Sequence, residues 1–332
     1  MTSLDAQYNS LLHTIRYTGV KKSSRSGDVI SSFGHVVQHD MSRGFPLLTT
    51  KKMAVSSIMK ELKWFLSGST DIRDLWRMNV NIWDGDWYKN YKKWCDSPYL
   101  LSEMKDISTR PSGYHDSVWD LGAIYGKQWR DFNGVDQIKN LLDELRSNPD
   151  SRRLMVNAWN PSDIPKMTLP PCHYSFQLYT KLLTVSQRVH LTIAADNNFD
   201  ILDLPLAEDS LDSVYHELLD TYNTPTRSVS LMWTQRSVDV PLGLCFNIAS
   251  YGMLLELIAH EVNMVPDMLR GNLGDCHIYE NQLDGVNIQT DRPGKSTFPS
   301  VKIISSDIMQ GAFEYEMINY QHDDIIRFPL SN

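Results

Sequence analysis

Apolar residues recur along the chain with two spacings, and each spacing predicts a type of element. A repeat of three and four residues predicts amphipathic helices, which cover the segments 5–18, 55–67 and 134–147. A continuous apolar stretch at 246–264 predicts one more helix. Strand-like patterns cover the segments 29–41, 152–160, 172–180, 189–194, 229–237 and 300–332. No internal repeat or clear linker separates these elements, so we expect a single domain over residues 1–332.

Two polar segments interrupt this pattern. The first, KKSSRSGD at 21–28, predicts a mobile loop. The second is the acidic part of the segment 185–225, which lies between the strand-like segments 189–194 and 229–237. It predicts a partly helical surface insertion at the end of a hairpin. Such an insertion could be a solvated excursion, could cover a dimer edge or could bind a partner.

Composition excludes several classes of protein. The chain has 332 residues, of which 42% are hydrophobic, and this is enough to bury a large core. Its formal net charge of −8 argues against nucleic-acid binding, which usually requires a basic surface. A local arginine cluster could still hold a small anion. We expect a cytoplasmic protein with no membrane segment, because no signal-peptide core and no apolar run of about 18 residues is present.

The four cysteines raise the question of a metal or a disulfide framework. They are Cys95, Cys172, Cys245 and Cys276, and none belongs to a CxxC pair. We therefore expect neither a zinc site nor any other bound metal. Nothing in their number or spacing indicates the disulfide framework of a secreted protein, which agrees with a reducing compartment.

Cys172 lies in the segment LPPCHYSFQLY and has two interpretations. A cysteine on an apolar strand is most often a packing residue. However, Arg152 and Arg153 precede it in the chain and Arg236 follows. Nearby positive charge lowers the pKa of a thiol and makes it a nucleophile, and the same arginines could bind a phosphate. The alternative for the arginine pair is a solvated turn.

Several long motifs follow one another along the chain. They are, in order, FPLLTTKK (45–52), KELKWFL (60–66), NIWD (81–84), LGAIYGKQWR (121–130), PDSRRLMVNAWNP (149–161), LPPCH (169–173), QRSVDVPLGLCFNIASY (235–251), GDCHIY (274–279) and INYQHDDIIRFPLSN (318–332). In these motifs the chain resembles the thymidylate synthase family and its nucleotide hydroxymethylase relatives. The resemblance covers most of the chain. It implies an α/β (α+β) fold in which a large mixed sheet packs against helices and also forms a homodimer interface.

The resemblance also implies a reaction. Cys172 matches the cysteine that adds to C6 of dUMP, after which C5 takes a one-carbon unit from 5,10-methylenetetrahydrofolate. Asn247 matches the asparagine that hydrogen-bonds the uracil ring, where relatives that act on dCMP have aspartate. Glu61, Tyr125 and His173 match residues that act in proton transfer or lie near the base.

Further matches assign binding residues for the two ligands and for a second subunit. On the nucleotide side, phosphate and sugar binders are matched by Arg25, Arg152, Arg153, Arg236, Ser237, His277 and Tyr279. On the folate side, the matching residues are Lys51, Trp83, Leu169, Asp239, Leu242, Gly243 and Phe246. Of these, Asp239 matches the aspartate that holds the pterin, and it also counts among the expected catalytic residues. The arginine pair at 152–153 matches one that reaches into the partner subunit's site.

The carboxyl terminus departs from the family pattern and bears on the product. Family synthases end in apolar residues that help to exclude water, whereas this chain ends in Leu330, Ser331 and Asn332. Water can complete the reaction in place of hydride when a site is not closed. This favours deoxyuridylate hydroxymethylation, as in bacteriophages with hydroxymethyluracil, which would place the enzyme in the host cytoplasm. Thymidylate synthesis is the alternative, and a catalytically inactive nucleotide-binding homologue is a minor one.

Overall fold

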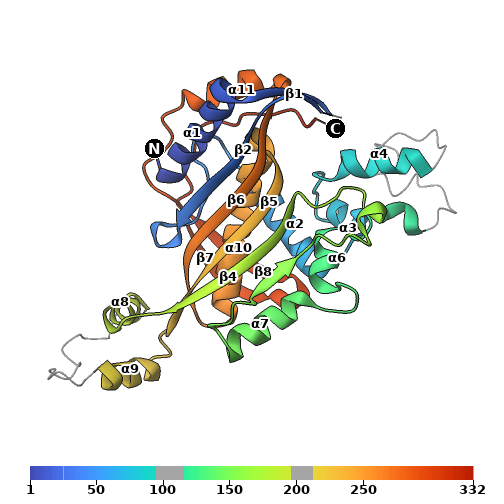
Figure 1. Cartoon of the computed structure of the whole chain (residues 1–332). Coiled ribbons are helices and arrows are strands. Elements are labelled where there is room, and N and C mark those ends of the chain that lie inside the picture. The colour runs from blue at the N-terminus through green and yellow to red at the C-terminus, as the bar shows by residue number, and fades with distance from the viewer. Residues whose placement is uncertain (25, 95–115, 196–211, 332) are drawn as a thin grey trace.

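A six-stranded mixed sheet runs through the centre of the molecule (Figure 1). The computed structural model describes residues 1–24, 26–94, 116–195 and 212–331. In sheet order the strands are β1 (Val20–Ser24), β2 (Gly27–Asp40), β6 (Val265–Tyr279), β5 (Arg227–Asp239), β4 (His173–Leu182) and β3 (Met155–Asn157). Strands β5 and β6 are parallel, and every other neighbouring pair is antiparallel. A separate hairpin consists of β7 (Ser300–Asp307) and β8 (Ala312–Ile318).

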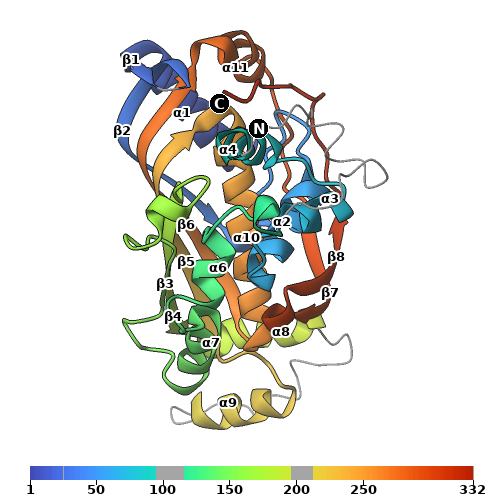
Figure 2. The same ribbon diagram turned by 90° about the vertical axis from the view of Figure 1, so that its right-hand side faces the viewer.

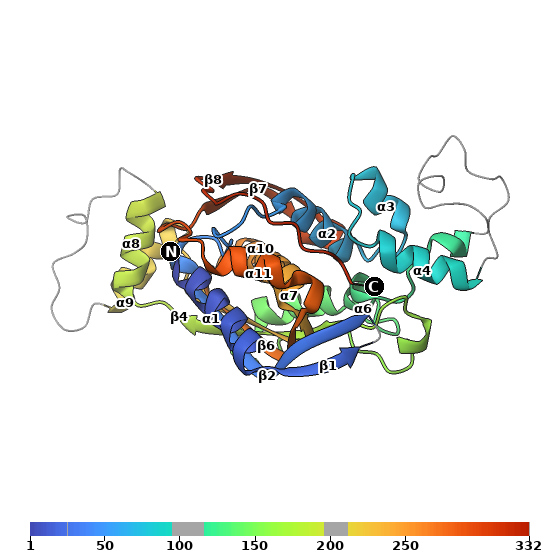
Figure 3. The same ribbon diagram turned by 90° about the horizontal axis from the view of Figure 1, so that it is seen from above.

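The helices that cover the sheet pack on one of its faces, as the two turned views show (Figures 2 and 3). The described α-helices are α1 (Ser3–Thr18), α2 (Val55–Ser67), α3 (Ile72–Arg77), α4 (Asp84–Trp94), α6 (Tyr125–Arg130), α7 (Gln137–Ser147), α8 (Val185–Ala195), α9 (Asp212–Thr221), α10 (Cys245–Glu261) and α11 (Leu283–Thr290). Helices α8 and α9 instead lie beyond the ends of β4 and β5 (Figures 2 and 3). The large mixed sheet packed against helices confirms the expected fold class.

Helix α10 is the central element of the core. It connects the parallel strands β5 and β6, which need a crossover connection of this kind. Trp233 of β5 stacks on Tyr251 of α10, with 5.2 Å between ring centroids. With the turn before it, α10 is long and apolar enough to cross a membrane, but 67% of that apolar window is buried inside the fold. Its apolar surface is therefore used in packing.

The helix predictions agree with the structure to within a few residues. The predicted segment 5–18 is α1, and 246–264 corresponds to α10. The segment 55–67 is α2, which ends at Gly68 with the left-handed φ of 74° that favours glycine. The segment 134–147 contains α7, whose start is shifted to Gln137 because Asp136 caps it.

Three strand or loop predictions were wrong. The segment 21–28 is not a loop, because Val20–Ser24 pairs with β2 as an exposed edge strand. The segment 189–194 is part of helix α8, in which Val189 and Thr192 are buried at helical spacing. The strand prediction for 300–332 is right only for the two strands β7 and β8, and the chain from Asn319 to Ser331 has no regular structure.

The predicted insertion lies at the end of the β4–β5 hairpin. The two strands pair as far as Leu182 and Arg227, and helices α8 and α9 lie in the connection between them. Residues 196–211 of this segment lie outside the described residues. The buried Arg188 joins the two helices, because its guanidinium donates to Asp220 and to the carbonyl oxygens of His216, Thr224 and Pro225. Val189 and Leu219 form a small core of their own there.

Candidate active site

A cavity with two connected chambers lies where β5 and β6 end. The inner chamber has a volume of about 400 Å³ and the outer chamber about 710 Å³. Both chambers are lined by Asp86, Leu169, Cys172, Ser237, Asp239 and Leu330. Their walls come from the β1–β2 hairpin, α2, α4, the start of β4, the end of β5 and the carboxyl-terminal segment. The expected site residues can therefore be located against one cavity.

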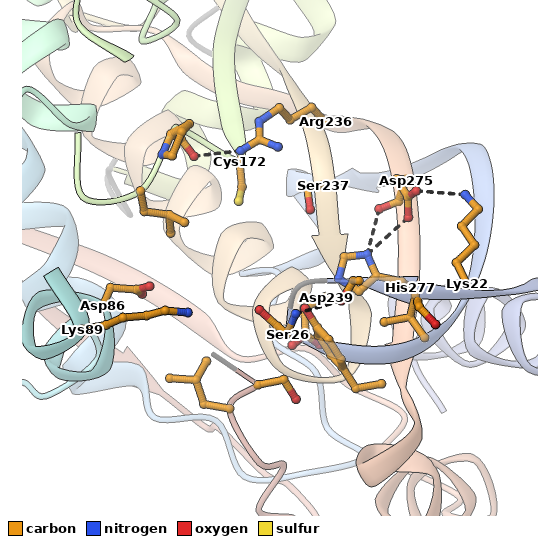
Figure 4. A pocket seen from close by; sticks show the side chains of 18 residues that line it. Lys22, Ser26, Asp86, Lys89, Cys172, Arg236, Ser237, Asp239, Asp275 and His277 are labelled. Atoms are coloured by element: carbon orange, nitrogen blue, oxygen red, sulfur yellow. Dashed lines mark hydrogen bonds and ion pairs between the residues drawn. The ribbon is translucent and has the colours of Figure 1, made fainter. Parts of the chain in front are cut away.

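Cys172 lies just before β4, with its side chain half-buried at the junction of the two chambers. Its backbone N–H donates to the hydroxyl of Tyr125 at 2.7 Å, and its carbonyl accepts from the backbone N–H of Arg236 at 2.8 Å. These two bonds hold the residue between α6 and β5. The thiol thus faces a cavity rather than the apolar core (Figure 4).

Arg236 is held beside Cys172 by hydrogen bonds to the two prolines that precede the cysteine in the chain. Its guanidinium donates to the carbonyl oxygens of Pro170 and Pro171, both at 2.9 Å, and lies 5.4 Å from the ring of Trp159. Arg236 and Ser237 both line the outer chamber (Figure 4). A positive charge held next to a thiol favours a nucleophilic thiolate, and the same charge can bind an anionic ligand.

A stack of aromatic rings supports the inner chamber. The ring of His173 stacks on Tyr125 at a centroid distance of 4.3 Å, and its Nδ1 lies 2.9 Å from the hydroxyl of Tyr251. Burial lowers the pKa of His173 to about 3. The imidazole is therefore neutral near pH 7, so it can accept or donate a hydrogen bond but does not supply a charge.

Glu61 of α2 is a buried carboxyl group on the wall of the inner chamber. Its Oε1 accepts from the indole Nε1 of Trp83 at 2.8 Å. Burial raises its pKa to about 7, with the Trp83 hydrogen bond acting in the opposite direction. A carboxyl group with this pKa can give and take protons near neutral pH. Trp83 also lines the chamber, so a single contact joins an acid–base group to an apolar wall.

Asn247 lies in the first turn of α10, and its amide is oriented by a residue that the sequence analysis missed. The buried Gln235 donates from Nε2 to Asn247 Oδ1 at 3.1 Å and to the Ser237 carbonyl at 3.1 Å. Its own Oε1 accepts from Trp233 Nε1 at 3.3 Å. These contacts leave the Asn247 NH₂ group as a donor. The available signal for Gln235 was its place in the alternation of β5, where it follows the apolar residues Val229, Leu231 and Trp233 at every second position.

Asp239 ends β5 and connects the chamber wall to the next turn. Its carboxylate accepts from the backbone N–H of Leu242 and from the side chain of Gln282. Desolvation raises its pKa above the ordinary value, and these hydrogen bonds oppose the rise. The apolar residues predicted for the folate side line the inner chamber, and they are Trp83, Leu169, Leu242, Gly243 and Phe246.

The carboxyl-terminal end of β6 places His277 and Tyr279 on the wall of the outer chamber. His277 pairs with Asp239 across the parallel strands, so the two side chains come from adjacent strand ends. Its Nδ1 lies 3.4 Å from one carboxylate oxygen of Asp275. The other carboxylate oxygen of Asp275 lies 3.3 Å from the ammonium of Lys22 in β1. Polar groups from three strands therefore meet in this chamber (Figure 4).

Of the predicted residues that the structure describes, three do not line either chamber. Lys51 is buried and donates to the Pro241 carbonyl, with its ammonium 4.6 Å from the centre of the Phe328 ring. Arg152 and Arg153 lie in an exposed turn and do not line either chamber. Arg25 lies outside the described residues.

The structure adds wall residues that the motifs did not indicate. Lys22, Asp86 and Lys89 line the outer chamber, and Phe328 and Ser331 contribute from the carboxyl-terminal segment. Segments outside the quoted motifs thus supply part of the wall, as do two residues of the last motif, 318–332, to which no binding role had been given. No group of three or more His, Cys, Asp or Glu side chains that could hold a metal is found in the described ranges.

Comparisons with known proteins agree with this geometry. A family model described as thymidylate synthase matches residues 6–332. A thymidylate synthase of Mycoplasma genitalium is 36% identical over 329 residues, which are 96% of this chain and 97% of that protein. One of Mycoplasma pneumoniae is 34% identical, over 97% and 98% of the two chains. One of the Aster yellows witches'-broom phytoplasma is 38% identical, over 90% and 89%. The chain belongs to the thymidylate synthase family.

Proposed function

We propose that this chain is a thymidylate synthase, which converts dUMP to dTMP. The family implies a one-carbon transferase that acts on dUMP with 5,10-methylenetetrahydrofolate as cosubstrate. The observation that carries the proposal is the junction of the chambers. There Cys172 lies between an inner chamber with apolar walls and an outer chamber that contains Arg236, Ser237, His277 and Tyr279. One chamber suits a ring system and the other suits a sugar phosphate.

In this proposal the nucleotide phosphate binds Arg236 and Ser237, and the deoxyribose hydroxyl contacts His277 and Tyr279. The thiolate of Cys172 then adds to C6 of the uracil, and the Asn247 NH₂ group stabilises the charge that develops on O4. Because C5 becomes nucleophilic, it can take up the methylene group.

The folate cosubstrate supplies the methylene group and then a hydride. The apolar wall and Asp239 would hold its pterin, and Glu61 would exchange protons at the base through ordered water. Loss of the C5 proton breaks the bond between the transferred carbon and the folate nitrogen, and hydride from the folate then reaches that carbon as the Cys172 sulfur leaves C6. The products would be dTMP and dihydrofolate, and the enzyme returns to its starting state. No metal enters this scheme.

The expected hydroxymethylase activity has less support than the synthase alternative. The relatives compared above are named thymidylate synthases and are bacterial, which gives no support to a bacteriophage source or to hydroxymethyluracil. Asn332, on which that expectation depended, lies outside the described residues. Leu330, two positions earlier, lines both chambers with an apolar side chain. An inactive homologue has no supporting feature of its own.

The product decides between the two reactions. Purified protein is incubated with dUMP and methylenetetrahydrofolate, the nucleotide is identified by mass, and the folate product by absorbance. We expect dTMP with dihydrofolate in equal amounts. Formation of 5-hydroxymethyl-dUMP with tetrahydrofolate would refute the synthase assignment.

We also propose that the enzyme is a homodimer. The sheet face opposite the helices presents large apolar side chains, with Val36 56%, Met155 50% and Tyr179 69% exposed. Met155 and Tyr179 come from the adjacent strands β3 and β4, in which Met155 pairs with Gln177. The successive pairings from β2 through β6 and β5 to β4 place Val36 on the same face of the sheet. Arg152 and Arg153 precede β3, whose residue Met155 lies on this face, and they do not line either chamber of their own subunit. A second copy that covers the face could receive this pair in its site.

Subunit complementation tests shared sites. The Cys172→Ala variant lacks the nucleophile, and a double Arg152→Ala, Arg153→Ala variant lacks the donated pair, so each should be inactive alone. Subunit exchange should restore one functional site per mixed dimer, and activity should reappear at up to about a quarter of the wild-type value. The exchange is verified with differently tagged chains, and mixed dimers without activity would contradict shared sites.

We further propose a cytoplasmic enzyme of one domain over residues 1–332. Its partners would then be dUMP, reduced folate and a second copy, with no nucleic acid or membrane. Residues from α1 to β8 pack in one buried cluster, which supports the single domain. The acidic net charge supports the exclusion of nucleic acid.

A further inference from the structure

The short turn after β6 contacts both the cavity wall and the carboxyl-terminal segment. It spans Glu280–Gln282, and the Gln282 side chain is only 1% exposed. The Nε2 atom of Gln282 lies 3.2 and 3.1 Å from the two carboxylate oxygens of Asp239 and 3.3 Å from the carbonyl oxygen of Pro329. Its Oε1 accepts from the backbone N–H of Tyr279 at 3.1 Å. One amide therefore joins three parts of the site.

The neighbouring residue strengthens the connection to the carboxyl-terminal segment. The Asn281 side chain donates to Ser331 Oγ at 3.3 Å. Leu330 lies between the two contacts in sequence, and its side chain lines both chambers. On the inner side of the same segment, Phe328 packs against Lys51. The turn thus holds the backbone on each side of the residue that contributes an apolar wall.

The chemistry of the amide explains why these contacts are coupled. An NH₂ group has two hydrogens, and here they are shared among two carboxylate oxygens and one carbonyl oxygen. The Gln282 carbonyl is fixed by the Tyr279 N–H, which sets the direction of the NH₂ group. Movement of Pro329 would remove one acceptor, and rotation of Asp239 would remove the others. Each partner therefore favours the position of the other through the same donor.

We propose that Gln282 is a positioning residue, which couples the docking of the carboxyl-terminal segment to the orientation of Asp239. Its effect on turnover rests on the proposed function, because Asp239 is there assigned to the pterin. Without the amide, Asp239 loses the donor that contacts both of its carboxylate oxygens, and Leu330 loses a support for its place over the cavity. Folate binding should weaken, and water should gain access to the reacting centre.

The coupling can be tested without turnover. Gln282→Met keeps the length of the side chain and removes its hydrogen bonds. Hydrogen–deuterium exchange by mass spectrometry should show faster exchange of the amides in 325–331 than in the wild type. The matched control is Gln289→Met in α11, which replaces another buried glutamine whose side chain donates to Thr50. Equal exchange of this segment in the wild type and Gln282→Met would overturn the proposal.

Kinetics separate positioning from a general loss of structure. Gln282→Met should raise the KM for methylenetetrahydrofolate about tenfold, as expected for loss of a charge-assisted hydrogen bond. The KM for dUMP should change by less than about twofold. The fraction of 5-hydroxymethyl-dUMP among the products should rise, and the control variant should show neither change. Equal losses for both ligands, with no change in product ratio, would refute a positioning role.

The two proposals can fail separately. If the wild type does not form dTMP, the proposed function is wrong, and the exchange experiment still decides whether Gln282 holds the segment. If the wild type forms dTMP and Gln282→Met shows unchanged exchange, only the coupling is wrong. Circular dichroism of both variants verifies that each is folded before these comparisons are made.

Discussion

At the scale of single residues, the site depends on side chains whose environment differs from water. Glu61 has a pKa of about 7 because it is buried, whereas His173 remains neutral for the same reason. Asn247 has one defined orientation because Gln235 occupies its carbonyl oxygen. The residue types were predictable from motifs. Their protonation states and orientations were not, since both depend on atoms contributed by distant parts of the chain.

The raised pKa of Glu61 predicts a dependence of stability on pH. Its ordinary value is 4.5, so between pH 4.5 and about 7 the native state retains a proton that the unfolded chain has released. Its contribution to the free energy of unfolding therefore falls as pH rises through this window. Glu61→Gln removes the effect and keeps an acceptor for Trp83. Its stability relative to the wild type should be greater at pH 8 than at pH 4.5 by up to about 3 kcal/mol.

Denaturant unfolding of both proteins at the two pH values measures this difference. The same variant should lose most of its turnover, because an amide cannot exchange protons with the base. An equal stability difference at pH 4.5 and pH 8 would mean that Glu61 titrates as an ordinary glutamate.

The orientation of Asn247 predicts a change of specificity. Its free NH₂ group suits the O4 acceptor of uracil, whereas the 4-amino group of cytosine needs an acceptor. Asn247→Asp should therefore lower the ratio of kcat/KM for dUMP to that for dCMP by at least about tenfold, the effect of one mismatched hydrogen bond. Asn247→Ala is the control, which should lose activity on dUMP without gaining any on dCMP. An unchanged ratio in Asn247→Asp would remove the assigned role.

At the scale of elements, the close contact between strands β5 and β6 depends on a glycine. A Cβ atom at Gly271 would lie 2.3 Å from Cζ2 of Trp233, which stacks on α10. Gly271→Ala should therefore destabilise the protein by about 3 kcal/mol, as overpacking does in a dense core. Gly34→Ala, where no atom lies near the added Cβ, should cost only the strain of its φ of +81°, about 1 kcal/mol. Urea unfolding compares the two, and equal effects would contradict the packing argument.

The elements also show where sequence patterns are informative. Helices α1 and α2 were predicted because their buried residues repeat at helical spacing. Strand β1 was not, because all its residues are exposed and only pairing with β2 makes it a strand. Helix α8 was predicted as a strand because its β-branched residues suit either element. Gln282 was missed because its partners, Asp239 and Pro329, are remote in sequence.

At the scale of the whole molecule, the excursion 184–225 is attached to the β4–β5 hairpin but has a separate small core. Its base is narrow, because Leu183 N–H donates to the Thr226 carbonyl at 3.0 Å. Replacement of 184–225 by Asn-Gly should leave turnover within about twofold of the wild type, since a two-residue turn can close this hairpin. Steady-state kinetics and sedimentation check activity and oligomeric state. Loss of turnover would show that the excursion contributes to the site, and a changed oligomeric state would show that it contributes to assembly.

The narrow base of the excursion has a practical consequence. The chain leaves and re-enters the sheet at neighbouring backbone positions, so any folded module with adjacent termini has a compatible attachment point there. A fluorescent reporter or a ligand-binding domain could be grafted at this place, as domain insertion generally succeeds at exposed hairpin ends. The hairpin continues along β5 to Gln235 and Asp239, and a grafted sensor would therefore be connected by one continuous strand to the candidate site.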